Sequence, residues 1–272
     1  MSATITQRVN AERVALLGWT RAILLQFAHP LIAAGVADHS TFRGSPFAAL
    51  SRLHHTLGAM RAITFGEDAA RDAALAGILS IHRRIDGTLP AAVGSYAAGT
   101  PYSAEDPDLV LWVHATLLES LPIIHDLIVA PVTTAQRDAH CEEAAPLAVA
   151  LGARPGDVPR CWRDLRQYIG GMYASGAIVV SPQARELAHA LLVPPILSLL
   201  AAPARRANEL IAVGLLPPHI RDQYGFGWDA GRDRWLRRLL LLLRAARRAT
   251  PDLIALWPDA RGLDRTPLPT SR

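Results

Sequence analysis

The chain has 272 residues, half of them hydrophobic, which is enough to bury a core without disulfide or metal staples. It contains no lysine, so all 28 basic side chains are arginines, and the formal net charge is only +4. The arginines are spread along the sequence with few aromatic residues among them, which argues against a nucleic-acid-binding protein. One basic cluster, from Arg232 to Arg248, predicts a solvated helix face, with a nucleic-acid or membrane patch as the alternative.

The cysteine content and the hydropathy argue against several further classes of protein. Cys141 and Cys161 are too few for an iron–sulfur cluster, and no C-x-x-C-H segment could attach a haem covalently. The polar N-terminal segment is unlike a secretory signal, so we expect a cytoplasmic protein. The apolar runs at 22–37, 191–204 and 239–243 are shorter than the ~20 residues that cross a bilayer, so we expect no transmembrane span. The mean hydropathy of +0.17 is compatible with peripheral contact with lipid or with binding of a hydrophobic ligand.

Helical periodicity dominates the chain, whereas β-branched alternation is almost absent, so we predict an all-α, single-domain helical bundle over residues 1–272. Residues 4–36 are predicted to form a first helix and then a second one that is interrupted near Pro30. The next helix opens at Ser45 and Pro46 and ends near residue 63. Gly87 is predicted to close a helix over 68–86. The glycine- and proline-rich segment 87–107 predicts a long loop with a functional role. Further helices are expected over 107–121, 134–151, 159–172, 181–192, 203–213 and 231–249.

A histidine stands in the apolar stripe of the helix predicted over 68–86. The stripe consists of Leu75, Ile78, Leu79, His82 and Ile85, and its i, i+3, i+4 spacing predicts that His82 points inward. A buried neutral imidazole needs a partner, because an unpaired buried polar group costs about 1–3 kcal/mol. The residues alone leave two interpretations open: a core histidine bonded to a backbone carbonyl, or a ligand of a metal or haem iron.

The preceding helix carries Arg52 and Thr56 four residues apart, on a face otherwise made of alanines. A helix with one small-residue face and one large apolar face suggests burial on both sides, so that Arg52 faces a pocket. A fixed guanidinium there would suit a carboxylate or a developing anion. The alternative is a surface arginine with alanines beside it.

The remaining polar candidates have ordinary structural explanations as well. Turn and capping chemistry accounts for Asp38, and His114 lies among residues that suit either a core or a pocket. We expect three other histidines in loops or at the surface: His125, His140 and His219. No H-E-x-x-H, G-x-S-x-G or G-x-x-x-x-G-K motif is present, which leaves zinc protease, serine hydrolase and nucleotide hydrolase functions without support.

Five segments in order carry a family resemblance: HPLIAAGVADHSTFRGSPF, RLHHTLGAMRAITFG, IHRRIDG, PYSAEDPDLVLWVHATLLES and LLPPHIRDQYGFGW. Together they resemble the catalytic domains of MpaB-type oxygenases and rubber oxygenase (latex-clearing protein), over about residues 13–258. The resemblance implies an all-α fold with a globin-like core that holds one haem b. The proximal ligand of the haem iron in this family matches His82.

The resemblance also assigns roles to residues before the proximal histidine. Rubber-cleaving members have an Arg-x-x-Lys-Thr motif, to which Arg52 and Thr56 correspond, whereas His55 replaces the lysine. His55 either reaches the iron on the distal side, as the lysine can, or leaves that role empty. Asp38 is the nearest carboxylate for the family's acidic base. Arg52 and Thr56 would also contact the haem, and His114 would line the pocket.

The function that the resemblance implies is a haem-dependent oxygenase, which uses dioxygen on a hydrophobic, unsaturated small molecule. Two alternatives stay open: a non-catalytic protein that binds haem or a lipophilic ligand, which the replaced lysine favours, and a family member that has lost haem. We expect no nucleic-acid partner. The sequence leaves the oligomeric state open, with a homodimer as one option.

Overall fold

The computed structural model of the protein describes residues 3–39, 46–192 and 202–263, and for residues 46–54 it describes the backbone alone. Within these ranges the chain forms thirteen α-helices and one pair of three-residue strands, which confirms the all-α prediction. The α-helices are α1 (Ile5–Ala11), α2 (Ala15–Phe27), α3 (Pro30–His39), α4 (Pro46–Phe65), α5 (Asp68–His82), α6 (Pro107–Ile124), α7 (Thr134–Ala150), α8 (Trp162–Ala174), α9 (Pro182–Leu192), α10 (Ala202–Gly214), α11 (Pro218–Tyr224), α12 (Ala230–Ala249) and α13 (Asp252–Ala255). The π-helix η2 (His125–Val129) continues α6, the 3-10 turn η4 (Pro258–Ala260) follows α13, and the strands are β1 (Asp86–Thr88) and β2 (Pro101–Ser103).

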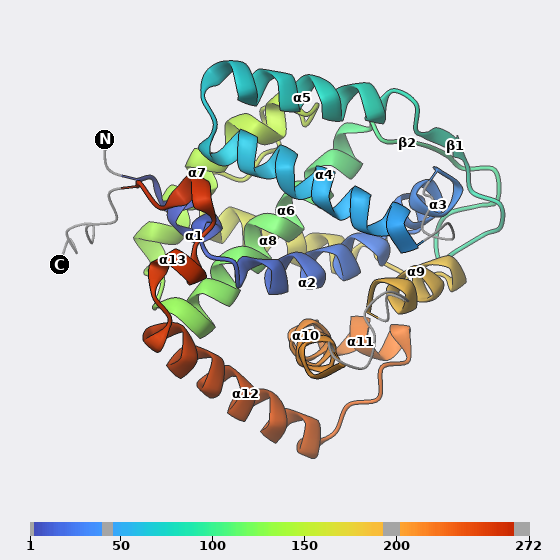
Figure 1. Cartoon of the computed structure of the whole chain (residues 1–272). Helices are drawn as coiled ribbons and strands as arrows, with labels where there is room; N and C mark the ends of the chain where they lie inside the picture. Colours follow the sequence, from blue (N-terminus) through green and yellow to red (C-terminus); the bar gives the residue numbers. More distant parts are fainter. Residues whose placement is uncertain (1–2, 40–45, 193–201, 264–272) are drawn as a thin grey trace.

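Helices α2 and α6 pack along each other in the middle of the molecule (Figure 1). They approach closely at Gly18, where an added Cβ would stand 3.0 Å from the Ser120 carbonyl oxygen. Helices α4 and α5 form a pair on one side of this centre, and α10, α11 and α12 lie on the other (Figure 1). The central pair therefore positions both outer layers.

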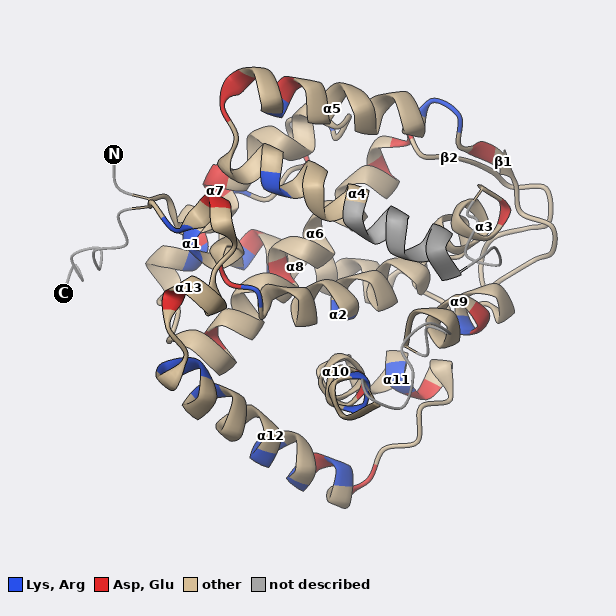
Figure 2. Cartoon of the chain, viewed as in Figure 1, with Lys and Arg blue, Asp and Glu red and all other residues tan. Residues whose placement is uncertain are grey.

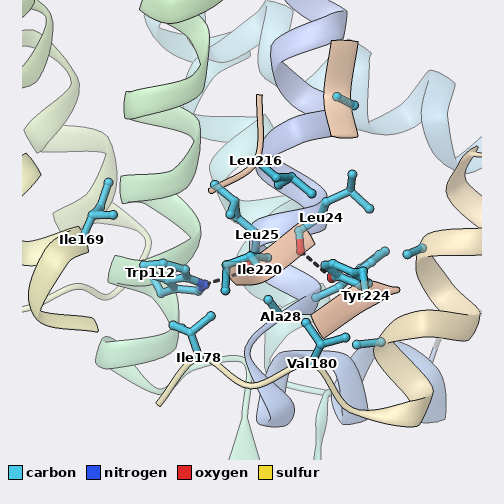
Figure 3. Close-up of a cluster of buried hydrophobic side chains, with 14 of the residues drawn as sticks. Leu24, Leu25, Ala28, Trp112, Ile169, Ile178, Val180, Leu216, Ile220 and Tyr224 are labelled. Carbon is cyan, nitrogen blue, oxygen red and sulfur yellow. Dashed lines mark hydrogen bonds between the residues drawn. The ribbon is translucent and has the colours of Figure 1, made fainter. Parts of the chain in front are cut away.

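The largest hydrophobic cluster surrounds α2 and α6, and two of its buried polar groups form hydrogen bonds (Figure 3). The indole Nε1 of Trp112, a fully buried side chain, donates to the Leu25 carbonyl at 3.2 Å. The Tyr224 hydroxyl donates to the Leu24 carbonyl at 2.6 Å, which ties α11 to α2. Both bonds satisfy groups that would otherwise be costly to bury.

The starts of α6 and α7 coincide with N-capping residues in the sequence. Asp106 caps α6 by accepting from the backbone N–H of Asp108, and Thr133 opens α7 with a capping box to Gln136. The predicted starts at 107 and 134 are thus confirmed. The predicted cap at Ser45 lies outside the described residues.

The end of α5 was predicted wrongly: the helix ends at His82 rather than at Asp86. The chain leaves the helix because the Ile85 carbonyl accepts from the Ala104 backbone N–H at 2.9 Å and the next residues enter β1. β1 pairs antiparallel with β2, so part of the predicted loop 87–107 is a small sheet. The helices α11 and α13 were not predicted either.

The continuous segment of α6 and η2, residues 107–129, is long and apolar enough to cross a membrane by length and composition. Within the most apolar window of this segment, 67% of the residues are buried inside the protein, as in the core helix of a soluble fold. In the described part of the chain, α2 and α3 also pass this test as a pair, but they are bent by 104°.

Candidate functional site

His82 occupies the last turn of α5, where the carbonyl end of the helix points towards the β1–β2 sheet. Its side chain is half-buried, and its Nδ1 atom is buried without a hydrogen-bond partner among the described residues. Burial lowers the pKa of the His82 imidazole, and the nearby Glu105 carboxylate opposes that shift. At neutral pH the imidazole is therefore uncharged, which is the form that binds a metal.

The apolar stripe around His82 faces α4 but is not a core. All five stripe residues, Leu75, Ile78, Leu79, His82 and Ile85, are half-buried, and α5 has no fully buried residue. The physical reason is that α5 lies at the edge of the molecule and packs mainly against a single helix. The inward direction predicted from spacing is confirmed, whereas the core histidine bonded to a backbone carbonyl is not what the structure has.

His114 lies on α6, half-buried, and its Nε2 atom is also buried without a partner among the described residues. Burial lowers the pKa of His114 to about 4, so this ring too is neutral at pH 7. His140 lies close enough to His114 that the protonated form of His114 lowers the pKa of His140 further. The prediction of a loop or surface position for His140 was wrong: it is 2% exposed on α7, because α1 covers it and Thr6 Oγ1 lies 2.9 Å from its Nδ1.

Asp38 belongs to a cluster that joins the end of α3 to the β1–β2 sheet. The Tyr102 hydroxyl donates to Asp38 Oδ2 at 2.5 Å, and the pKa of Tyr102 is raised by burial and by this bond. His39 Nε2 donates to the Asp86 carbonyl at 2.9 Å in the same region. Gly87 is required opposite Tyr102, because an added Cβ would stand 2.4 Å from the phenol oxygen. The Asp38 carboxylate thus anchors the loop that follows His82.

The other predicted residues lie on α4. Its backbone carries Arg52, but the Arg52 side chain lies outside the described residues. The side chains of His55 and Thr56 are exposed. A small pocket, partly open to solvent, lies between α1, α2 and α4, and its walls include Trp19, Met60 and other apolar side chains. None of the predicted site residues lines it.

Tyr102 and Glu105 were not singled out by sequence reasoning, although the structure gives both a place near the end of α5. The signal that could have found Tyr102 is the pairing of Gly87 with an aromatic residue across a short sheet. Glu105 follows β2 as an exposed carboxylate, and nothing in its local sequence distinguishes it from an ordinary turn residue.

Two features around α5 fit a haem. The neutral His82 has one ring nitrogen, Nδ1, without a hydrogen-bond partner among the described residues, and the half-buried Leu75, Ile78 and Leu79 of the same helix place apolar side chains between α5 and α4. A hydrophobic porphyrin with one axial imidazole ligand needs both an imidazole nitrogen and apolar side chains beside it. In the ranges that the structure describes, no three His, Cys, Asp or Glu side chains come together to hold a bare metal ion.

Comparison with known proteins identifies the family of the chain. Residues 6–245 match the family described as ER-bound oxygenase mpaB/B'/rubber oxygenase, catalytic domain. The chain is also 25% identical over 234 residues to uncharacterized proteins of Mycobacterium bovis (Mb2261) and Mycobacterium tuberculosis (Rv2237), covering 84% of this chain and 87% of each relative. No solved structure matches the chain. Because the match spans most of the sequence, the protein belongs to the family of mpaB and rubber oxygenase catalytic domains, as the resemblance predicted.

Proposed function

We propose that the protein is a haem b-dependent oxygenase that acts on a hydrophobic, unsaturated small molecule with dioxygen. The observation that carries the proposal is the neutral His82 imidazole, whose buried nitrogen has no partner among the described residues, beside the half-buried stripe of α5. Membership of an oxygenase family supports the reaction class. Haem would supply a redox-active iron for the activation of dioxygen.

In this proposal, residues of several helices have roles at the haem site. His82 would be the axial ligand, and Glu105 would favour a more basic imidazole through its charge. His114 is neutral, its buried Nε2 has no partner among the described residues, and it would offer a hydrogen bond to a bound ligand. Arg52 and Thr56 would contact the haem or bound oxidant from α4, and Asp38 would hold the loop after His82 through Tyr102.

The first experiment establishes the cofactor. We would express the protein with haem supplied and record the Soret band and the haem stoichiometry by the pyridine haemochrome method. The proposal expects one haem per chain, its loss in His82→Gly, and partial recovery of the Soret band on adding imidazole. His189→Gly is the matched control, because His189 is an exposed histidine on α9. A colourless wild-type protein, or a haem retained by His82→Gly, would refute ligation by His82.

The second experiment separates catalysis from binding. The ferrous protein would be mixed with oxygen and a panel of polyisoprenes, terpenes and unsaturated fatty acids while oxygen uptake and products are followed. Products with oxygen added at a double bond support the oxygenase. A haem protein that consumes no more oxygen than a haem-free control would instead be the non-catalytic binding protein, which the exposed positions of His55 and Thr56 favour.

The role of His55 has its own test. If His55 reaches the iron, His55→Ala shifts the resting spectrum towards five-coordinate, high-spin iron. An unchanged spectrum would exclude His55 from the distal side.

We also propose a cytoplasmic location. Cys141 and Cys161 support it, because both are free thiols in the structure, as expected in a reducing compartment. Fractionation of expressing cells, with Cys161 labelled by an impermeant thiol reagent only after lysis, would test the location.

A further inference from the structure

Helix α12 lies along one edge of the molecule and is covered on one side only (Figure 1). Leu236 and Leu240 form its buried face and pack into a cluster with Ile128 and Ile211 of η2 and α10. The opposite face carries Trp235, Leu241 and Leu242, whose side chains are 64%, 68% and 67% exposed. These three residues contribute little to the core, so the fold does not explain why they are apolar.

The next helix along the chain also carries exposed apolar side chains. Leu253 and Ile254 on α13 are 67% and 63% exposed, and only one other large hydrophobic side chain among the described residues, Ile81, is similarly exposed. Five of these six side chains thus lie within 20 residues of one another in two consecutive helices. Exposed apolar residues that gather in this way mark an interaction surface rather than ordinary scatter.

The same helix is strongly basic, as the blue segments of α12 show (Figure 2). It contains seven arginines and one aspartate. Arg237 pairs with Asp233 and Arg247 with Glu12, but Arg238 and Arg248 form no ion pair with any described residue. Arg238 instead lies over the Trp235 ring, 5.7 Å from its centroid. The exposed Arg238 and Arg248 thus flank the exposed Leu241 and Leu242 along the helix.

We propose that this surface, made of Trp235, Leu241, Leu242, Leu253 and Ile254 with Arg238 and Arg248, docks onto an anionic lipid bilayer. Leucine and tryptophan side chains enter the boundary between headgroups and acyl chains, and arginines bind the anionic phosphates around them. An amphipathic helix lying in the plane of the interface needs this combination of residues.

Two other occupants fit the surface less well. A second copy of the chain would bring the arginines of one α12 against those of the other, which costs electrostatic energy. A nucleic acid would bind the arginines, but it would leave the exposed leucines in water and gain nothing from them. The lipid surface alone satisfies both the charge and the apolar side chains, and this inference does not depend on the proposed function.

The test is co-sedimentation of the full-length protein with vesicles of phosphatidylcholine alone and of phosphatidylcholine mixed equally with phosphatidylglycerol. We expect binding to the anionic vesicles only. The Arg238→Gln/Arg248→Gln pair should weaken the partition coefficient by about 25-fold, from about 5-fold for each arginine near the surface. Leu241→Ser/Leu242→Ser should weaken it by about 10-fold or more, because less apolar area enters the interface.

Matched controls come from outside the surface. Arg163→Gln removes an 87% exposed arginine on α8, and Ile81→Ser removes an exposed isoleucine on α5, so neither should change vesicle binding. Insertion is read separately by quenching of tryptophan fluorescence with brominated lipids. The quenching should fall in Trp235→Phe, a variant that retains an aromatic ring.

Several outcomes would overturn the proposal: no sedimentation with anionic vesicles, equal binding to neutral vesicles, or an unchanged affinity in the leucine variant. Dimerisation that Leu241→Ser/Leu242→Ser abolishes, without vesicle binding, would assign the surface to a second copy of the chain. None of these measurements involves haem or turnover, so failure here is distinguishable from failure of the oxygenase proposal.

Discussion

A buried ion cluster between α2 and α6 gives a sharp prediction of stability. Arg21 is 4% exposed, and its guanidinium donates to Glu119 at 2.9 Å, to Ser120 Oγ at 2.6 Å and to the Leu215 carbonyl at 2.8 Å. Glu119 is 1% exposed and also accepts from Arg166. Burial lowers the pKa of Arg21 to about 10, so Arg21 stays charged at pH 7. Arg21 is therefore a buried cation whose counter-ion is the Glu119 carboxylate.

The perturbation is Glu119→Gln, which preserves the size of the side chain but removes its charge. The buried guanidinium then loses its counter-ion, and breaking one side of a buried pair typically costs about 3–5 kcal/mol. For a chain of this size that loss corresponds to a fall in Tm of roughly 10 °C. The control is Glu142→Gln, because the Arg160–Glu142 pair is 52% and 58% exposed and contributes about 0–1 kcal/mol.

Urea unfolding followed by circular dichroism at pH 7 measures both free energies of unfolding. Glu119→Gln should lower the free energy of unfolding several times more than Glu142→Gln does. A loss below about 1 kcal/mol in Glu119→Gln, with an unchanged m value, would mean that water or another group solvates Arg21, and the reasoning from burial would be refuted.

Three further predictions concern other parts of the chain. Gly87→Ala should displace Tyr102, whose phenol oxygen would lie 2.4 Å from the new Cβ, and lower Tm by several degrees in a thermal melt; an unchanged Tm would contradict the close packing. Burial lowers the pKa of His140 to about 3, so below pH 6.5 the unfolded chain binds a proton at this residue that the folded chain does not. Lowering the pH from 7 to 5 should therefore reduce the free energy of unfolding by about 2 kcal/mol through His140 alone. Urea titrations at both pH values should show a smaller loss in His140→Asn, and an equal loss would exclude this residue as a cause. Burial raises the pKa of Cys141 to about 12, so iodoacetamide should label Cys161 long before it labels Cys141 in the native protein, as peptide mass spectrometry would show; equal rates would argue against the buried thiol.

The sequence located helix boundaries well where a local signal sets them and less well where a distant contact does. Asp106 with Pro107, and Thr133 with Gln136, are local signals that act within one turn, and the helices begin where these signals stand. The end of α5 depends on a bond between Ile85 and Ala104, which are far apart in the sequence. A local pattern could not predict that bond, and it placed the helix end four residues too late.

Part of the candidate site could likewise be predicted from the sequence, whereas the rest depends on contacts made by the folded chain. Spacing alone assigned His82 to the apolar stripe of α5, and the family resemblance, confirmed over residues 6–245, named it as a ligand. The roles of His82, Arg52, His55, Thr56 and Asp38 in binding and catalysis remain predictions. Only the folded chain brings Tyr102 to Asp38 and Glu105 towards His82, because those contacts join segments about 20 to 60 residues apart.

What the sequence by itself determined is the all-α class, the faces of its helices and the family, since periodicity, capping and motif order are local or linear properties. Only the tertiary structure decided how deeply each face is buried. The stripe of α5 is half-buried because one helix covers it, and His140 is buried because α1 lies over α7. Trp235 and Leu241 stay exposed for the same reason, because burial depends on which neighbours the fold supplies and not on the residue alone.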